Sequence, residues 1–249
     1  MAAVLFGALL HASWNAIVKS GNDKLLDTLL VACGAALVSA ATLPFLPLPA
    51  AESWPYLVAS AIIQLAYLAL VAAAYRTGDL SYVYPIMRGT APLLTALFAG
   101  RFIAERLTPG GWVGILLTSA GIVLLAGNQW RRGQMQLSRT LFALGNAVVI
   151  CVYTLVDGIG TRLSGNSFSY VGWTLVLNGV ILAAFVLARR VDALPRQLRA
   201  RWHIGIGGGL CAWGSYAIAL WAMTRRPWRR WLRYARPRSY SAPFSPQWC

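Results

Sequence analysis

A few hydrophilic side chains interrupt long apolar stretches of this sequence, and Arg88 is the one best suited to binding a solute. It stands in the middle of an apolar run, where a charged side chain is costly and by default marks a functional pathway. Tyr84 lies one turn earlier on the same helical face. A guanidinium group can pair with both oxygens of a carboxylate or phosphonate, so we expect Arg88 to bind an anionic group. The alternative is a structural role, in which Asp157 or helix carbonyls satisfy Arg88.

The first apolar run carries a second polar group. His11 and Asn15 are four residues apart and therefore share a helical face, and Trp14 is adjacent to that face. We expect these side chains to hydrogen-bond a substrate and to stack on it. The alternative is that they hydrogen-bond to other helices and hold a bundle together, as polar residues commonly do in membranes.

Later runs add further candidates for the same substrate site. Gln64 and Tyr67 lie in the third run, and Tyr216 and Trp213 lie in the last one. Tyr67 and Tyr216 are expected to face a cavity, whereas Trp213 is equally suited to a structural position.

Asp157, near the end of the sixth run, is a candidate carboxylate for coupling transport to an ion gradient. The residues that follow it, Gly158, Gly160 and Arg162, instead favour a position at the membrane interface. Both interpretations are kept.

The sequence contains no constellation typical of an enzyme or a metal site. It has two His and four Cys residues without metal-ligand spacing, and no Ser/His/Asp set, dinucleotide fingerprint or ATP-binding motif. We therefore predict a non-enzyme without a cofactor or bound metal. The glycines of 207–209, and Gly110, Gly111 and Gly114, are predicted to allow close helix packing.

The elements that position these side chains follow from the composition. Of the 249 residues, 58% are hydrophobic and only 12% are charged, and the mean hydropathy is +0.58. Soluble domains carry about 25% charged residues, so this is the composition of a multi-pass membrane protein. Each span must be a helix, because lipid-exposed backbone has to satisfy its own hydrogen bonds. Eight runs approach the length of a span: 2–18, 28–46, 56–75, 80–99, 110–127, 140–156, 168–188 and 204–223.

The two halves of the chain look related. Tyr67, Ala73 and Arg76 in the third run match Tyr216, Ala222 and Arg225 at one constant offset. If the repeating unit has five spans, its second copy must cross the bilayer in the opposite direction. Inverted repeats of this kind are the architecture of secondary transporters, whose substrate site lies between the repeats.

Three segments resemble EamA-type transporters of the drug/metabolite transporter superfamily. Residues 11–19 (HASWNAIVK) are similar to the first-helix signature of that family, and 92–127, which includes ERLT at 105–108, is similar to the end of a repeat. Residues 153–158 (YTLVDG) resemble the start of the second repeat. The resemblance covers about residues 1–225 and implies ten helices in two five-helix repeats that move small metabolites across the inner membrane. This chain supplies eight of the ten.

The resemblance divides the chain into a first repeat (1–127), a linker (128–138), a partial second repeat (139–224) and a basic tail (225–249). The tail contains seven Arg and no acidic residue. One interpretation is a segment that binds anionic lipid or nucleic acid. The other, which we favour, is a reading-frame shift near residue 225, since a shifted frame with allowed codons encodes an apolar span similar to the family's ninth helix. Under this interpretation the chain is a C-terminally truncated transporter, or a remnant that does not transport.

The net charge of +15 suggests nucleic acid, but the basic residues of the body lie between the apolar runs and therefore indicate topology. No nucleic acid partner is expected; the expected partners are a small-molecule substrate and the lipid bilayer, and an oligomer is left open. The connections after runs 1, 3, 5 and 7 are far richer in Lys and Arg than those after runs 2, 4 and 6. This favours an external N-terminus, although members of the family more usually have it in the cytoplasm.

Overall fold

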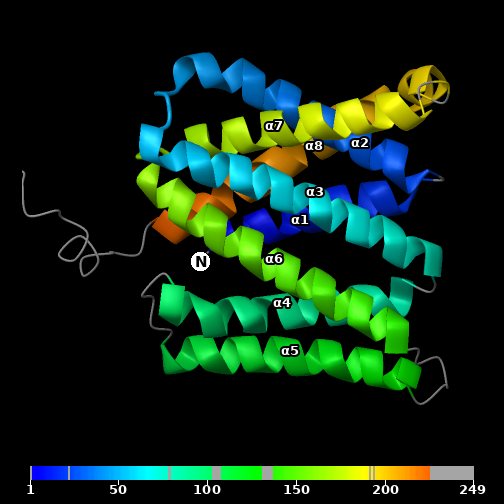
Figure 1. Cartoon of the computed structure of the whole chain (residues 1–249), viewed down its shortest axis with the longest axis vertical. Coiled ribbons are helices and arrows are strands. Elements are labelled where there is room, and N and C mark those ends of the chain that lie inside the picture. The colour runs from blue at the N-terminus through cyan, green and yellow to red at the C-terminus, as the bar shows by residue number, and fades with distance from the viewer. Residues whose placement is uncertain are drawn as a thin grey trace, which may run out of the picture.

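The chain folds as an all-α helical bundle, as predicted. The computed structural model describes residues 2–21, 23–77, 80–102, 108–130, 137–190, 192 and 194–224. The basic tail lies outside them. The described helices are α1 (Ala2–Lys19), α2 (Lys24–Thr42), α3 (Trp54–Thr77), α4 (Leu80–Phe102), α5 (Pro109–Trp130), α6 (Leu137–Leu163), α7 (Ser167–Arg190) and α8 (Leu194–Thr224), with two short 3-10 turns, η1 (Leu43–Phe45) and η2 (Ala51–Ser53), between α2 and α3 (Figure 1).

Five of these helices are long and apolar enough to cross a membrane. In the part of the chain that the structure describes, they are α1, α2, α6, α7 and α8. Helices α3, α4 and α5 occupy the other three predicted runs and stay predicted spans. The described ends of the predicted linker 128–138 belong to α5 and α6.

Side-chain hydrogen bonds and a glycine turn set where α2 and α7 begin. Asp23 caps α2, because its Oδ1 accepts hydrogen bonds from the backbone N–H groups of Leu25 and Leu26, both at 3.1 Å. Between α6 and α7 the chain turns at Gly165, whose φ of +75° is a left-handed conformation that favours glycine. Asn166 then accepts from the Ser169 N–H at 3.1 Å and starts α7.

The last helix differs from its predicted bounds. It begins at Leu194 instead of residue 204, and non-helical backbone angles at Arg201 kink it. A prediction from apolar residues begins the helix only after the charged side chains, but the backbone is already helical there. Arg196 and Arg199 are exposed while the helix continues.

Helices from the first half of the chain pack mainly against helices from the second half. Helix α1 packs against α8, α3 packs against α6, and α2 packs against both α7 and α8. Along the bundle, α1, α2 and α3 run opposite to α6, α7 and α8, respectively (Figure 1). Helix α4 packs against α6, and α5 packs against α4 on the side away from α6 (Figure 1).

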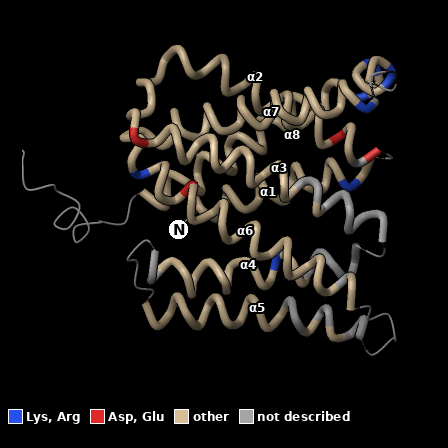
Figure 2. The backbone as a smooth tube through the Cα atoms, in the orientation of Figure 1, with Lys and Arg blue, Asp and Glu red and all other residues tan. Residues whose placement is uncertain are grey.

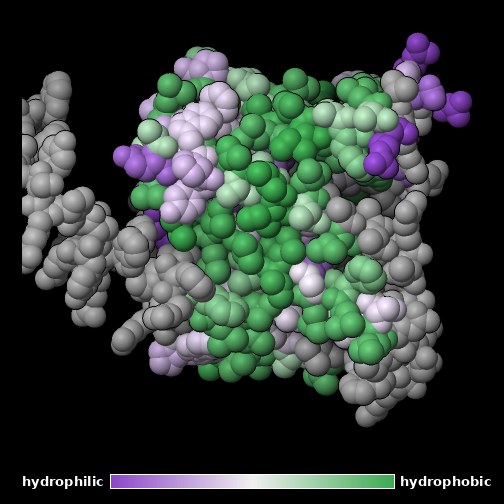
Figure 3. Space-filling model, in the orientation of Figure 1, coloured by the Kyte–Doolittle hydropathy of each residue, from purple (hydrophilic) through white to green (hydrophobic). Residues whose placement is uncertain are grey.

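The distribution of polarity fits a lipid environment. Large apolar side chains such as Leu5, Leu37 and Leu117 are exposed, whereas Ser60, Thr174 and Asp157 are buried. Green, apolar atoms cover the middle of the face in Figure 3, and purple ones gather toward its ends. Soluble proteins have the reverse arrangement, with charged and polar groups outside. The bundle therefore presents the outer surface of a membrane protein.

Glycines allow the closest approach between α2 and α8. A Cβ on Gly34 would lie 1.8 Å from the Gly205 carbonyl oxygen, and one on Gly209 would lie 2.5 Å from the Ala35 nitrogen. The predicted packing role is therefore right for Gly208 and Gly209. It is wrong for Gly207, Gly110 and Gly114, which have no described atom within 4 Å of such a Cβ.

Candidate functional site

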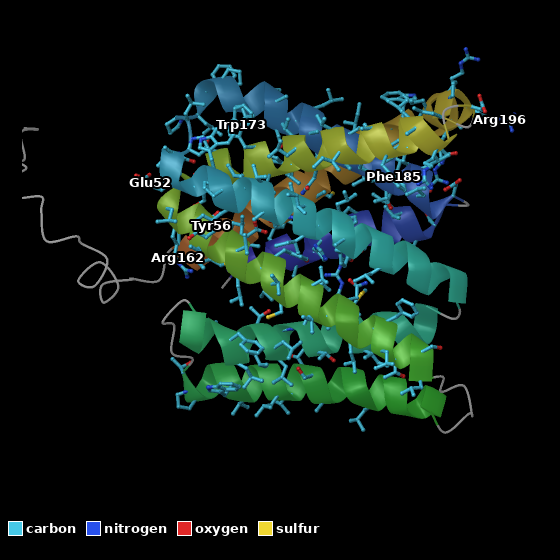
Figure 4. The ribbon with its side chains drawn as sticks, viewed as in Figure 1. Glu52, Tyr56, Arg162, Trp173, Phe185 and Arg196 are labelled. Atoms are coloured by element: carbon cyan, nitrogen blue, oxygen red, sulfur yellow. The ribbon has the colours of Figure 1, made fainter. Side chains whose placement is uncertain are left out.

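A cavity of about 360 Å³ lies inside the bundle. Among the described residues, those that line it belong to seven helices: α1, α2, α3, α4, α6, α7 and α8. Figure 4 labels residues toward the two ends of the bundle, with Glu52, Tyr56, Arg162 and Trp173 at one end and Phe185 and Arg196 toward the other. The polar and aromatic side chains of the lining are His11, Trp14, Thr28, Gln64, Tyr67, Arg88, Tyr153, Thr154, Asp157, Asn178, Ser215 and Tyr216.

Arg88 enters this cavity from the middle of α4. Figure 2 shows that most of the blue and red segments lie toward the two ends of the bundle, whereas the helices between them are largely tan. The neighbouring Met87 and Ala91 pack against Ala143, Ala147 and Ile150 of α6, which fixes the face of α4 that turns inward. The side chain is partly buried, with its Nε inaccessible to solvent. Arg88 thus brings a positive charge into a largely apolar interior, where an anionic group gains most from it.

Aromatic rings surround the space near this charge. His11 and Trp14 of α1 meet edge to face, with ring centroids 5.2 Å apart. Tyr67 of α3 and Tyr153 of α6 also meet edge to face, at 6.1 Å. All four rings line the cavity. Their flat faces and polar edges suit a small solute that has both apolar and polar parts.

Asp157 is the acidic member of the site. It is 1% exposed and accepts hydrogen bonds from Tyr170 of α7, at 3.1 Å to Oδ1, and from Tyr216 of α8 to Oδ2. Ser60 of α3 is a further hydrogen-bonding neighbour of the carboxylate. Three hydroxyl groups from three other helices therefore surround one carboxylate, which can only accept hydrogen bonds while it is ionised.

The carboxylate of Asp157 is buried in the bundle and lines the cavity, and its position near the membrane interface stays a prediction. Arg162, five residues later, is the side chain at the end of the helix. It donates to the carbonyl oxygens of Gly158, at 3.1 Å, and Met223, at 3.0 Å, and so holds the end of α8 against α6.

An amide pair joins α3 to α7 beside the cavity. Asn178 Nδ2 donates to Gln64 Oε1 at 2.7 Å, and Gln64 Nε2 donates to Ser60 Oγ at 2.9 Å. Gln64 was predicted for the site and Asn178 was not. The signal was present in the sequence, since Asn178 is an amide in the middle of an apolar run.

Most of the residues predicted for the site come together in this cavity. His11, Trp14, Gln64, Tyr67, Arg88, Asp157 and Tyr216 all line it.

Two predicted residues do not line the cavity. Asn15 instead bonds its own helix, with Nδ2 donating to the His11 carbonyl oxygen at 2.8 Å. Trp213 is partly buried elsewhere, and its Nε1 has no hydrogen-bond partner among the described residues. Tyr84 belongs to α4, but its side chain lies outside the described residues.

Sequence comparisons provide no relative for this chain. No protein-family model matches it, and no curated protein does either. Among the described residues, no three His, Cys, Asp or Glu side chains gather as a metal ion would require.

Proposed function

We propose that this protein is a secondary transporter, a carrier that moves a small polar or anionic metabolite across a membrane by alternating access. The observation that carries the proposal is Arg88 in a cavity lined by residues of seven helices. A buried charge is expensive in a membrane and is retained mainly where a pathway uses it. The cavity is also of the size that small-molecule sites have, about 300–1,000 Å³.

The packing supports an inverted repeat as the basis of transport. Exchanging helices 1–3 with helices 6–8 converts the contact of α1 with α8 into the contact of α6 with α3, and both exist. The exchange also maps the contact of α2 with α7 onto itself. The cavity lies between the two sets of helices, which is where secondary transporters place their substrate. This arrangement agrees with the resemblance to EamA-type transporters, which we propose as the family.

The carrier moves its solute unchanged, so we propose no catalytic residue. Arg88 binds the anionic group, and Trp14, Tyr67 and Tyr216 provide aromatic walls. The location that we propose is the inner, or plasma, membrane. Alternation requires the bundle to open at one end at a time, with the solute held near the middle.

The test is solute uptake by the purified protein in liposomes. A panel of labelled carboxylates, phosphonates and neutral polar solutes is compared between the wild type, Arg88→Ala and the matched control Arg189→Ala. Arg189 is exposed near the end of α7, 5.5 Å from the centre of the Phe185 ring. A hydrogen bond to a charged group contributes about 1.5–3 kcal/mol, so Arg88→Ala is expected to weaken the apparent affinity about 10- to 100-fold.

Two outcomes contradict the proposal. Uptake of none of the solutes by the wild type favours a remnant that does not transport. Equal uptake of an anionic solute by the wild type and Arg88→Ala removes Arg88 from the site.

A further inference from the structure

Four side chains form a hydrogen-bonded series from the cavity wall to the buried carboxylate. Asn178 of α7 donates to Gln64 of α3, which donates to Ser60 one turn earlier. Ser60 is completely buried and lies beside Asp157 of α6 as a hydrogen-bonding neighbour. We call these four residues the relay.

Each bond in the relay has a direction. Ser60 Oγ accepts from Gln64 Nε2, so the single hydrogen of its hydroxyl is left for the Asp157 carboxylate. Gln64 uses its amide nitrogen toward Ser60, so only its oxygen remains to accept from Asn178. An ionised carboxylate accepts and never donates, and this orders the whole series toward Asp157.

Asn178 is the end of the relay that keeps a polar atom for a solute. It lines the cavity, and its amide nitrogen is engaged with Gln64. Within the described part of the chain, its Oδ1 has no hydrogen-bond partner. With Asp157 ionised, Asn178 therefore offers a bound molecule a hydrogen-bond acceptor.

We propose that Asn178 is a solute-contacting residue whose hydrogen-bonding character is set by the proton on Asp157 through Gln64 and Ser60. When a proton from the solvent adds to the carboxylate, the new O–H donates to Ser60 Oγ. The Ser60 hydrogen then turns toward Gln64, whose amide rotates to present Oε1 to Ser60 and Nε2 to Asn178 Oδ1. Asn178 now presents its amide nitrogen to the cavity, and a donor has replaced the acceptor.

The groups around Asp157 allow the hydrogen bonds of the relay to reverse without the binding of an additional ion. Among the described residues, the ionisable groups that line the cavity with Asp157 or contact its carboxylate are Tyr67 of α3, Arg88 of α4, Tyr170 of α7, Tyr216 of α8, Tyr153 of α6 itself and His11 of α1. Glu52 on η2 is exposed at the end of the bundle. Hydroxyl groups of Tyr170 and Tyr216 can donate to the carboxylate or accept from the acid, so they accommodate both states.

The relay rests on the proposed function, because it gives the carrier a means to couple a proton to its solute. A solute that donates to Asn178 binds the ionised state better, and one that accepts from it binds the protonated state better. Differential affinity of this kind is what a coupled equilibrium requires.

The test is an infrared difference spectrum of the solubilised full-length protein, recorded between high and low pH without any solute. Selective ¹³C labelling of the side-chain carbonyls of Asn and Gln separates their bands from the backbone. In the wild type, the carboxylic acid band of Asp157 should appear together with a shift of the Asn and Gln bands. Asp157→Asn should abolish both changes. Ser60→Ala should keep the acid band and lose the amide shift.

Ser39→Ala is the matched control, because Ser39 is also completely buried and its hydroxyl has no partner among the described residues. It should leave both changes as in the wild type. Asn178→Leu identifies the labelled band of Asn178 itself. The proposal is overturned if no acid band is lost in Asp157→Asn, or if Ser60→Ala leaves the amide shift intact. Because no solute is present, failure of the relay is distinguishable from failure of transport.

Discussion

Arg201, at the kink of α8, forms an ion pair with Asp27 in the first turn of α2, with 3.2 Å between Nε and Oδ1. Gln197 Nε2 donates to the same oxygen at 2.7 Å. Asp27 is completely buried, and Gly21 lies so close that a Cβ there would overlap its Oδ2. The next residue, Thr28, lines the cavity, so this ion pair joins two helices directly beside the candidate site.

Removing one partner of this pair should destabilise the bundle. Asp27→Asn or Arg201→Gln leaves the other charge uncompensated, which costs about 3–5 kcal/mol for buried pairs. The lower end is expected here, because the Arg201 side chain is 23% exposed. Denaturant titration in mixed micelles measures the change, with the exposed Arg199→Gln as the control. The double variant should recover part of the loss, and single variants as stable as the wild type would show that the pair contributes nothing.

The glycines between α2 and α8 should not tolerate a methyl group. Gly34→Ala and Gly209→Ala place a Cβ against backbone atoms of the opposite helix at 1.8 and 2.5 Å, and overpacking of this kind costs about 1–3 kcal/mol or more. Gly207→Ala is the control on the same helix, since a Cβ there meets nothing within 4 Å. It should gain up to about 1 kcal/mol from helix propensity. Thermal unfolding of the three variants measures the difference, and equal midpoints would refute the close approach.

The hydroxyls around Asp157 should contribute to stability individually. Tyr170→Phe and Tyr216→Phe each remove one donor to a buried carboxylate, and a hydrogen bond to a charged group contributes about 1.5–3 kcal/mol. Tyr56→Phe on α3 is the control, because its hydroxyl has no hydrogen-bond partner among the described residues. Unfolding free energies in the same detergent provide the measurement. Losses no larger than that of Tyr56→Phe would mean that Asp157 does not depend on these donors.

The charge distribution predicts the orientation of the bundle. The end that carries Arg196, Arg199 and Arg201 should face the cytoplasm, because positively charged connections are retained there. A reporter fused at Ser138, at that end of α6, should give a cytoplasmic signal. The same reporter at Leu48, in the connection between η1 and η2 at the opposite end, should give an external one (Figure 1). The reversed pair of signals would place the N-terminus in the cytoplasm.

The positions of the helices along the chain could be predicted far better than the side of each helix that faces the cavity. Apolar runs located every described helix, and the main error was the start of α8, where Arg196 and Arg199 obscure a helix that continues to Leu194. The candidate site was predicted through polar residues inside those runs. That reasoning found Arg88 and Gln64, but it also selected Asn15 and Trp213, which do not line the cavity. Two polar residues on one helix can point to different neighbours, and the hydropathy of a run does not distinguish them.

The amino-acid sequence by itself determined that the chain forms apolar helices with a few costly hydrophilic side chains inside them. This follows because lipid leaves the backbone no hydrogen-bond partner outside its own helix. Only the tertiary structure decided that Asn178 meets Gln64, that Tyr170 and Tyr216 converge on Asp157, and that Asp27 pairs with Arg201. These contacts join helices far apart in the chain, and they depend on how each helix is rotated and how closely the glycines let it approach its neighbour.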